Sequence, residues 1–322
     1  MKRIDTLLTA LPLREDQKER LKQLLPDAEI IFRGFMKPEK EEVLKADVIF
    51  GNVEPEHIGG AEKLKWVQLA TAGSDNYAPV MPPGVLLTNA TGSYGPAISE
   101  YMLAVLLSLL KKLPRYYENQ KKGLWKREGT VGAIENSVCL VVGLGDIGGS
   151  FARKMKALGA YTIGVRRRDM RKPEYVDELY GMDALDSLLP RADVVALSLP
   201  QSPETNGLMN GERLALMKKG SILINVGRGS AVDQQALAST LNSGHLGGAA
   251  LDVAVPEPLP PEDPIWNAKN ILITPHASGG WSLPSTIDRV MDIFLENLKA
   301  WQEGAPMKNL VDPESGYRRT PE

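Results

Sequence analysis

Three short segments in the second half of the chain each carry one side chain suited to acid–base or ionic chemistry. Arg228 lies between two glycines, Glu257 lies between two prolines, and His276 directly follows a Thr-Pro pair. Each segment leaves an apolar run that predicts a β-strand, and open α/β sheets bind their ligands outside the carboxyl ends of the strands. The pattern therefore predicts a cation, a carboxylate and an imidazole at one edge of a sheet.

Taken singly, an arginine or glutamate on a loop more often lies on the solvated surface than in a functional site. A histidine after a strand more often has a structural than a catalytic role. As a set, the three residues suit the reduction of a 2-keto acid. Arg228 can form bidentate hydrogen bonds with a substrate carboxylate and polarise the neighbouring carbonyl group. His276 can deliver a proton to the forming alkoxide, because histidine titrates close to neutral pH. Glu257 can orient the imidazole through its second ring nitrogen.

A glycine-spaced turn precedes these segments and indicates a dinucleotide. Residues 137–142 form an apolar strand that leads into Gly143, Gly145 and Gly148 and then into a helical pattern. Gly143 permits a tight turn, Gly145 lets the backbone approach a pyrophosphate, and Gly148 lets the helix pack closely on the strand. The unpaired N–H groups of the first helical turn attract an anion. The alternative is a sharp turn that binds no ligand.

The residues after the second strand of this region bear on the choice of dinucleotide. Sites that prefer NAD usually carry an acidic residue about 20 positions after the glycines, where it binds the ribose 2′-hydroxyl. This chain instead has Arg166, Arg167 and Arg168, followed by Asp169. Guanidinium groups pair with a 2′-phosphate, which a carboxylate would repel. We therefore expect NADP(H), with NAD(H) as the alternative cofactor and a solvated basic loop as the structural alternative.

Length and composition indicate a soluble protein of two domains. A chain of 322 residues is longer than one hydrophobic core usually accommodates, so two domains are expected. A net charge of −2 gives no general attraction to nucleic acid or to an anionic membrane. The single cysteine, Cys139, lies in an apolar strand, so we expect a reducing compartment and no disulfide. The amino-terminal residues have no signal-peptide pattern, and the apolar run 101–110 is too short to span a bilayer. We expect a cytoplasmic protein, and we assign no metal-binding residues.

Apolar strands alternate with amphipathic helices along the chain, which predicts parallel sheets covered on both faces. The early strands are expected at Ile4–Leu8, Glu29–Phe32, Val48–Phe50, Trp66–Ala70 and Val85–Asn89, with helices at Arg14–Leu25, Glu39–Lys45 and Ala97–Leu113. Six later strands are expected at Val138–Val142, Tyr161–Val165, Val194–Leu199, Ile222–Val226, Ala249–Val253 and Ile271–Thr274. A last helix, Thr286–Gln302, is expected to return to the first domain.

The predicted fold class is therefore α/β, with two doubly wound parallel-sheet domains. A Rossmann dinucleotide-binding domain, residues 101–285, is inserted into a flavodoxin-like substrate domain formed by residues 1–100 and 286–322.

The chain resembles the D-isomer-specific 2-hydroxyacid dehydrogenase family over essentially its full length. The matching features are Gly143-Leu144-Gly145-Asp146-Ile147-Gly148, Leu199-Pro200 with Thr205, Asn225-Val226-Gly227-Arg228-Gly229, Leu251-Asp252-Val253 with Glu257-Pro258, and Thr274-Pro275-His276. The resemblance implies hydride transfer from the nicotinamide, with Arg228, Glu257 and His276 as the catalytic residues. It also implies that Asp252, Val226 and Gly227 lie near the nicotinamide amide, next to His276. The resemblance further implies that Asp146, Ile147, Leu199, Pro200 and Thr205 are cofactor residues.

The resemblance also bears on substrate and assembly. Residues 72–76 match the family's substrate loop, where the N–H groups of Gly73 and Ser74 would hold the carboxylate, and the family typically dimerises through its cofactor domains. The segment around Tyr94 has bulkier residues than the corresponding segment of the family, so Tyr94 is a candidate for lining the substrate pocket. Trp281 is expected either in the wall of that pocket or in the hydrophobic core. The substrate stays open among glyoxylate, hydroxypyruvate, pyruvate and branched or aromatic 2-keto acids.

Two other classes of function compete with a dehydrogenase. A cofactor-sensing regulator could keep the fold and lose turnover, because fold alone does not determine function. Against it, the chain retains Arg228, Glu257 and His276. A methyltransferase would also use a glycine-rich turn, but the arginine, glutamate and histidine set does not suit that chemistry. We therefore expect a soluble 2-keto acid reductase whose partners are its small-molecule substrate and a second copy of itself, without nucleic acid or membrane.

Overall fold

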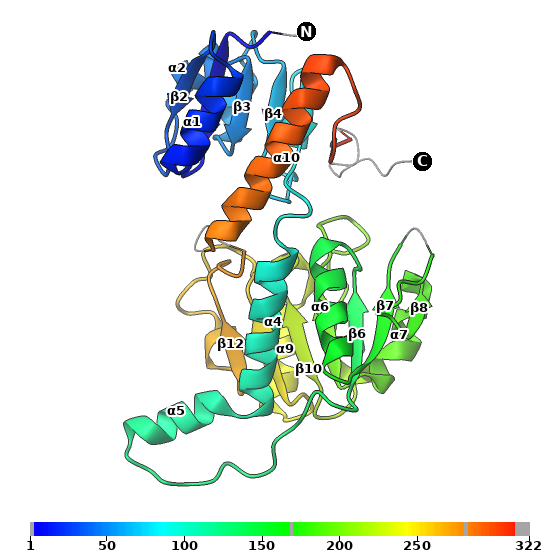
Figure 1. Cartoon of the computed structure of the whole chain (residues 1–322). Helices are drawn as coiled ribbons and strands as arrows, with labels where there is room; N and C mark the ends of the chain where they lie inside the picture. Colours follow the sequence, from blue (N-terminus) through cyan, green and yellow to red (C-terminus); the bar gives the residue numbers. More distant parts are fainter. Residues whose placement is uncertain (1–2, 168–169, 280–282, 313–322) are drawn as a thin grey trace. The chain divides into compact units, whose positions relative to one another are not determined.

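The computed structural model describes residues 3–167, 170–279 and 283–312, and these divide into two compact units. Unit 1 contains the described residues of 1–94 and 281–322, and unit 2 contains those of 95–280 (Figure 1). Unit 2 is thus inserted into unit 1 along the chain. The assignment of the units to substrate and cofactor, with boundaries at residues 100 and 285, remains a prediction.

The described residues of unit 1 form a five-stranded parallel sheet in the order β2-β1-β3-β4-β5. Its strands are β1 (Thr6–Ala10), β2 (Glu29–Phe32), β3 (Val48–Gly51), β4 (Trp66–Gln68) and β5 (Leu86–Thr88). Its helices are α1 (Glu15–Leu24), α2 (Lys40–Lys45), α3 (Pro55–Ile58), the 3₁₀ turn Ala78–Val80 and α10 (Pro284–Glu303). The expected strands and helices of this region are therefore present, with ends shifted by a few residues.

Helix α10 joins the far end of the chain to the first sheet. Phe294 on this helix is fully buried, and its ring stacks on Phe50 of β3 at 4.0 Å and near Trp66 of β4 at 5.2 Å between ring centroids. Asn297, one turn further along, donates a 2.9 Å hydrogen bond to the side chain of Gln68. Burying a phenylalanine contributes about 2–3 kcal/mol, so α10 is an integral part of unit 1.

The described residues of unit 2 form a seven-stranded parallel sheet in the order β12-β11-β10-β9-β6-β7-β8. Its strands are β6 (Val138–Val142), β7 (Tyr161–Val165), β8 (Glu178–Tyr180), β9 (Val194–Leu197), β10 (Ile222–Asn225), β11 (Gly248–Leu251) and β12 (Ile271–Ile273). The expectation of six strands is corrected by β8. The sequence does not predict this strand, because its three residues lie at a sheet edge and are all partly exposed, so they form no buried apolar run.

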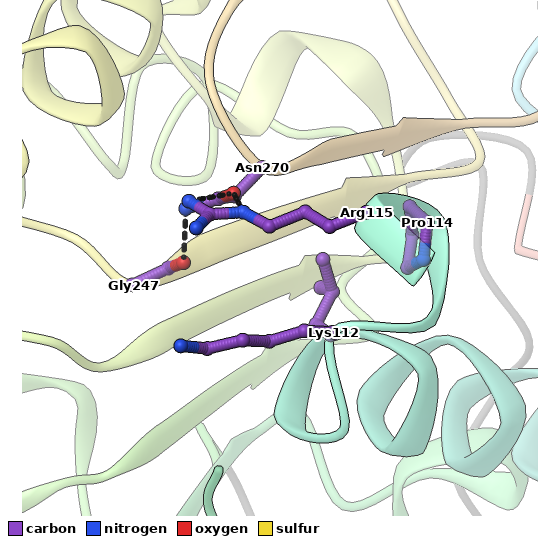
Figure 2. A pocket seen from close by; sticks show the side chains of 6 residues that line it. Lys112, Pro114, Arg115, Gly247 and Asn270 are labelled. Carbon is purple, nitrogen blue, oxygen red and sulfur yellow. Dashed lines mark hydrogen bonds between the residues drawn. The ribbon is translucent and has the colours of Figure 1, made fainter. Parts of the chain in front are cut away.

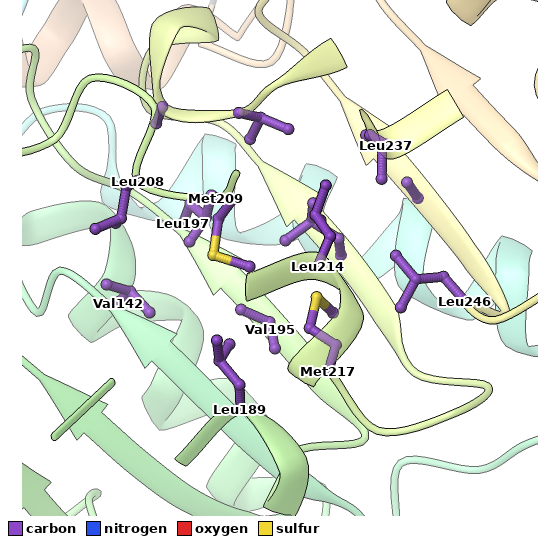
Figure 3. Packing of buried hydrophobic residues seen from close by; sticks show 14 of the residues in the cluster. Val142, Leu189, Val195, Leu197, Leu208, Met209, Leu214, Met217, Leu237 and Leu246 are labelled. Atoms are coloured by element: carbon purple, nitrogen blue, oxygen red, sulfur yellow. The ribbon is translucent and has the colours of Figure 1, made fainter. Parts of the chain in front are cut away.

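The helices and 3₁₀ turns of unit 2 connect these strands. They are α4 (Gly95–Leu110), α5 (Leu113–Lys121), α6 (Asp146–Ala157), α7 (Leu185–Leu188), α8 (Gly211–Leu216), α9 (Gln234–Asn242) and 3₁₀ turns at Met182–Ala184, Leu189–Arg191, Gly229–Ala231 and Pro264–Asn267. Buried side chains such as Val195, Leu197 and Leu214 converge between β9 and α8 in one apolar cluster (Figure 3). This cluster fixes the sheet whose edge carries the candidate site.

The expected helix Ala97–Leu113 is instead two helices, α4 and α5. Lys112 adopts a left-handed backbone with φ of 58°, and Pro114 lies in the first turn of the new helix. Proline cannot continue a helix without a clash, so the chain turns at this point. Helix α5 buries none of its residues, and it projects from the body of unit 2 (Figure 1). Within the described ranges, no helix has the length and apolar character needed to cross a membrane.

Candidate active site

The candidate site lies at the carboxyl edge of the seven-stranded sheet in unit 2. The sheet order reverses between β6 and β9, and ligands of doubly wound sheets bind at such a switch point. Gly143 follows β6, Arg228 follows β10, Asp252 follows β11 and His276 follows β12. Because all these strands are parallel, the four residues leave the sheet at the same edge.

His276 and Glu257 form a direct pair within unit 2. The Nδ1 atom of His276 lies 2.9 Å from Oε2 of Glu257, and the side chains are 53% and 41% exposed. The other carboxylate oxygen of Glu257 accepts a 3.0 Å hydrogen bond from the backbone N–H of Ala254. Glu257 is therefore held at both oxygens. Because Nδ1 donates to this carboxylate, Nε2 is the ring atom that can exchange a proton with a substrate.

Asp252 fixes the backbone that carries His276. Its side chain is almost completely buried, and its carboxylate oxygens accept the backbone N–H groups of Ala277 and Ser278, at 2.9 and 3.1 Å, and the Ser278 hydroxyl, at 2.5 Å. Its backbone carbonyl accepts the His276 N–H at 2.8 Å. His276 has φ of 50°, a region that non-glycine residues adopt only when the surroundings enforce it.

Close backbone contacts at the two neighbouring glycines fix the position of Arg228 in its loop. A Cβ added at Gly227 would lie 2.5 Å from the carbonyl oxygen of Leu199, and one added at Gly229 would lie 2.2 Å from that of Ala254. The segment therefore fits between the Leu199 loop and the loop that carries Glu257. Asn225 fixes the turn, because its amide nitrogen donates to the Arg228 carbonyl at 2.9 Å. Arg228 itself is half-buried, and its Nη1 donates to the Gly227 carbonyl.

The glycine turn has the geometry that a pyrophosphate requires. Gly143 has φ of 97°, and a Cβ at Gly148 would lie 1.9 Å from the Gly143 carbonyl oxygen. By contrast, a Cβ at Gly145 would meet no heavy atom of the described chain within 4 Å. Gly145 precedes the first turn of the 12-residue helix α6. Open space at a helix amino terminus suits a phosphate group, so these residues fit a dinucleotide.

The remaining cofactor candidates surround this turn. Asp146 in the first turn of α6 accepts the backbone N–H of Gly95 at 2.8 Å, which ties α6 to the start of α4, and Ile147 is half-buried beside it. Leu199, Thr205 and Val226 are buried, whereas Pro200 is exposed. The Thr205 hydroxyl donates to the Pro200 carbonyl at 2.8 Å and accepts the Ser202 N–H at 2.8 Å. Thr205 thus closes the loop after β9.

A basic cluster, of which the structure describes Arg166 and Arg167, follows β7 at the same edge of the sheet. Arg166 is half-buried and donates to the backbone carbonyl of Arg171, whereas Arg167 is exposed. The pKa of the Glu204 carboxyl is lowered, chiefly by a hydrogen bond from Ser202 and to a smaller degree by the charge of Arg167. That interaction connects the cluster with the loop closed by Thr205. Arg168 and Asp169 lie outside the described residues.

The candidate substrate residues belong to unit 1. Gly73 and Ser74 lie in a loop whose carbonyls, from Ala70 to Ser74, all accept hydrogen bonds within this unit. The Tyr94 hydroxyl donates one of these bonds, to Ala70 at 2.6 Å. Tyr94 is buried, which raises its pKa, so the hydroxyl stays protonated. Its role toward a substrate remains a prediction, and Trp281 lies outside the described residues.

The structure adds residues that the sequence pattern alone did not assign to the site. Asn225 and Thr274 stand inside the motifs, but their side-chain contacts depend on neighbouring strands. Thr274 donates to Asp252 at 2.6 Å and contacts the Tyr101 hydroxyl at 2.6 Å. Tyr101 is on α4, more than 100 positions earlier in the chain, and its spacing gave no signal of this contact.

A separate pocket lies at the opposite, amino-terminal edge of the same sheet (Figure 2). Gly247 precedes β11 and Asn270 precedes β12 in its wall. Its two cationic side chains are bound within the protein, because Arg115 donates to the side-chain oxygen of Asn270 at 2.9 Å and Lys112 donates to the Glu128 carbonyl at 2.6 Å. Arg228 and His276 follow the carboxyl ends of β10 and β12, so they lie at the other edge.

The described sheet of unit 2 has the Rossmann strand order, and the glycine turn after β6 fits the pyrophosphate of a dinucleotide. Residues 103–278 match the family model described as D-isomer specific 2-hydroxyacid dehydrogenase, NAD binding domain. The chain belongs to this family.

Individual relatives agree with this assignment. A glyoxylate reductase of Korarchaeum cryptofilum is 31% identical over 282 residues, which cover 84% of this chain and 82% of the relative. A family member of Aeromonas salmonicida has a solved structure with 34% identity and a TM-score of 0.84, covering 96% of this chain and 99% of that one. A further member, from Xanthobacter autotrophicus, was solved with NADPH and MES; it is 30% identical with a TM-score of 0.80, covering 98% and 100%.

We predict that Gly148→Ala impairs dinucleotide binding. The new methyl group would overlap the Gly143 carbonyl, so the turn and α6 must separate, at a cost of about 1–3 kcal/mol in stability. Fluorescence titration with NADPH and NADH should show at least about tenfold weaker binding. Gly211→Ala is the matched control, because its Cβ would lie at an ordinary 3.6 Å from Ala236. Equal affinities in the two variants would contradict the tight-turn interpretation.

Proposed function

We propose that the protein reduces a small 2-keto acid to the D-2-hydroxy acid with hydride from NADPH, and catalyses the reverse reaction. The observation that carries this proposal is the 2.9 Å contact between His276 and Glu257 at the sheet edge that also carries Arg228. The likeness to a glyoxylate reductase and to an NADPH-bound family member supports it. Glyoxylate and hydroxypyruvate are the first substrates to test.

The proposed roles follow from the chemistry of each side chain. Arg228 binds the substrate carboxylate and polarises the adjacent carbonyl. When bound, the nicotinamide supplies the hydride that the carbonyl carbon accepts. His276 gives the proton on Nε2 to the carbonyl oxygen, and Glu257 holds the ring through Nδ1. The backbone N–H groups of Gly73 and Ser74 contribute to carboxylate binding, which is consistent with a loop whose carbonyls are all bound elsewhere.

For the cofactor we propose a preference for NADP(H) over NAD(H). Arg166 and Arg167 follow β7, where an NAD-specific site would have a carboxylate. Arg168 belongs to the same proposed cluster. The open side of Gly145 and the amino terminus of α6 fit the pyrophosphate, which both dinucleotides share. The preference therefore depends on the arginines alone.

We also propose that the protein acts in the cytoplasm as a homodimer formed through unit 2. Helix α5 and the segment after it expose Leu113, Tyr117, Leu124, Trp125 and Val131. The segment is fixed although it buries little, because Lys111 and Lys112 donate to the carbonyls of Gly132 and Glu128 at 2.7 and 2.6 Å. A preorganised, exposed apolar surface is typical of a protein interface.

A dinucleotide-sensing regulator is the competing function. It would bind NADPH at the same turn, but it would show no turnover. The retained pair of His276 and Glu257 supports turnover, because a sensor has no need of a proton donor. NADPH oxidation measured against a panel of 2-keto acids separates the two functions. Binding without oxidation across the panel would favour the regulator.

The first prediction from the proposed function concerns the proton donor. His276→Ala should lower kcat for 2-keto acid reduction by about 10²–10⁴, because general acid catalysis is lost, while NADPH affinity stays within about twofold. Stopped-flow measurement of NADPH oxidation checks the chemical step. His245→Gln is the control, since His245 binds the Met217 carbonyl away from the candidate residues. If His276→Ala retains the wild-type rate of the chemical step, His276 is not the donor.

The second prediction concerns cofactor choice. Arg166→Asp should weaken NADPH relative to NADH by about 1–3 kcal/mol, because charge-assisted bonds to the 2′-phosphate are replaced by repulsion. Competitive titration with both dinucleotides measures the ratio. Arg20→Asp, an equal charge reversal on α1 of unit 1, should leave the ratio unchanged. A wild-type protein that prefers NADH would remove the basis of the NADP(H) proposal.

The third prediction concerns assembly. Trp125→Ser should shift the protein from dimer to monomer in sedimentation velocity at micromolar concentration, because an exposed tryptophan is a typical centre of an interface. Phe35→Ser, which changes an exposed aromatic residue of unit 1, should leave the sedimentation coefficient unchanged. A Trp125→Ser protein that remains dimeric would place the interface elsewhere.

A further inference from the structure

A chain of three hydrogen-bonded side chains connects α4 with the segment that carries His276. The Tyr101 hydroxyl lies 2.6 Å from Oγ1 of Thr274, and Oγ1 lies 2.6 Å from Oδ1 of Asp252. A carboxylate only accepts hydrogen bonds, so the Thr274 hydroxyl donates to Asp252. Thr274 has a single hydroxyl proton, and its contact with Tyr101 must therefore be one in which Tyr101 donates. The direction of the whole chain is fixed.

The acceptor at the end of this chain is the group that shapes the histidine segment. Asp252 accepts the N–H groups of Ala277 and Ser278 and the Ser278 hydroxyl, and its carbonyl accepts the His276 N–H. The left-handed backbone of His276 is unfavourable for a residue with a Cβ. The direction of the imidazole therefore depends on how firmly Asp252 is held, and Thr274 is one of the groups that hold it.

Tyr101 is well suited to be the fixed end of the chain. It lies on α4, which packs against α6 within unit 2, and the start of α4 is tied to α6 by the bond between Gly95 and Asp146. Burial is the largest influence and raises the pKa of the Tyr101 hydroxyl above its ordinary value; the hydrogen bond with Thr274 lowers this pKa, and the nearby charge of Asp252 raises it. The hydroxyl thus remains a donor throughout the pH range in which the protein would work.

We propose that Tyr101 is a positioning residue for the proton donor: through Thr274 and Asp252 it holds the 274–278 segment in the one arrangement that directs His276 toward the substrate carbonyl. This inference rests on the proposed function, in which His276 donates the proton. Tyr101 does not contact Glu257 in this scheme, so the histidine is held by two separate supports. Glu257 holds the ring, and the Tyr101 chain holds the backbone.

The first test is kinetic. Tyr101→Phe removes the hydroxyl and keeps the ring, so kcat for 2-keto acid reduction should fall about three- to tenfold, the effect of one buried hydrogen bond, while KM for NADPH stays within twofold. Thr274→Val should produce a similar loss, and Thr274→Ser should restore most of it. The double variant Tyr101→Phe/Thr274→Val should be no slower than the worse single variant, because both changes break the same chain.

The second test does not require turnover. The chain has three histidines, so the imidazole signals of His57, His245 and His276 can be assigned by NMR. Tyr101→Phe should shift or broaden the His276 signals and leave those of His57 and His245 in place. Tyr161→Phe is the matched control, because it removes a hydroxyl that donates to Glu178 at the start of β7, at the opposite edge of the sheet. It should change neither kcat nor the His276 signals.

The kinetic and NMR measurements together decide whether Tyr101 holds the segment that carries His276. An unshifted His276 signal together with wild-type kcat in Tyr101→Phe would overturn the proposal. Multiplied losses in the double variant would also overturn it, since they would show that Tyr101 and Thr274 act independently. If the wild-type protein reduces no 2-keto acid, the proposed function fails, and the NMR comparison still decides whether Tyr101 holds the histidine segment. A fall in thermal stability without any shift of His276 would assign Tyr101 to packing alone.

Discussion

The geometry of the candidate site depends on one buried carboxylate, Asp252. Asp252 follows β11, and its oxygens accept donors from the segment that follows β12. A buried carboxylate is costly unless its lone pairs are satisfied, so the protein gains most when Thr274, Ala277 and Ser278 all face it. The chain after β12 turns around this carboxylate, and His276 in that turn has a left-handed backbone with φ of 50°. The backbone beside the imidazole is therefore bound to Asp252, whereas the ring itself is bound to Glu257.

Close backbone packing has the same importance for the cofactor turn and for Arg228. At Gly148, Gly227 and Gly229 another carbonyl oxygen occupies the space of a side chain. These glycines let three loops approach one another at the edge where β6, β9 and β10 end. Gly145 differs, since the space beside it is open. The same residue type therefore serves two purposes, dense packing between loops and access for a phosphate group.

The two supports of His276 have different physical characters. Glu257 is partly exposed, so its contact with the ring is accessible to water and adjusts readily. The hydrogen-bonded chain from Tyr101 through Thr274 to Asp252 is less exposed than the contact with Glu257. Its bonds run in one direction, because each hydroxyl has a single proton to donate. An exposed partner suits a group that gains and loses a proton, which is the role proposed for His276. An enclosed chain suits the backbone, which stays in place during the proposed proton transfer.

Patterns in the sequence predict the parts of this protein that depend on local structure. Apolar runs predicted the strands of both sheets except β8, and the glycines from Gly143 to Gly148 predicted the turn. Arg228, Glu257 and His276 were named from residue type and from their place after strands. The sequence could not reveal β8, whose short edge strand has no buried run, or α5, which buries none of its residues. The donors around Asp252 and the contact between Tyr101 and Thr274 follow from the packing of the folded chain. Those contacts join α4 to segments more than 150 positions away, and hydrogen-bond partners at such distances are chosen by how the strands and helices pack.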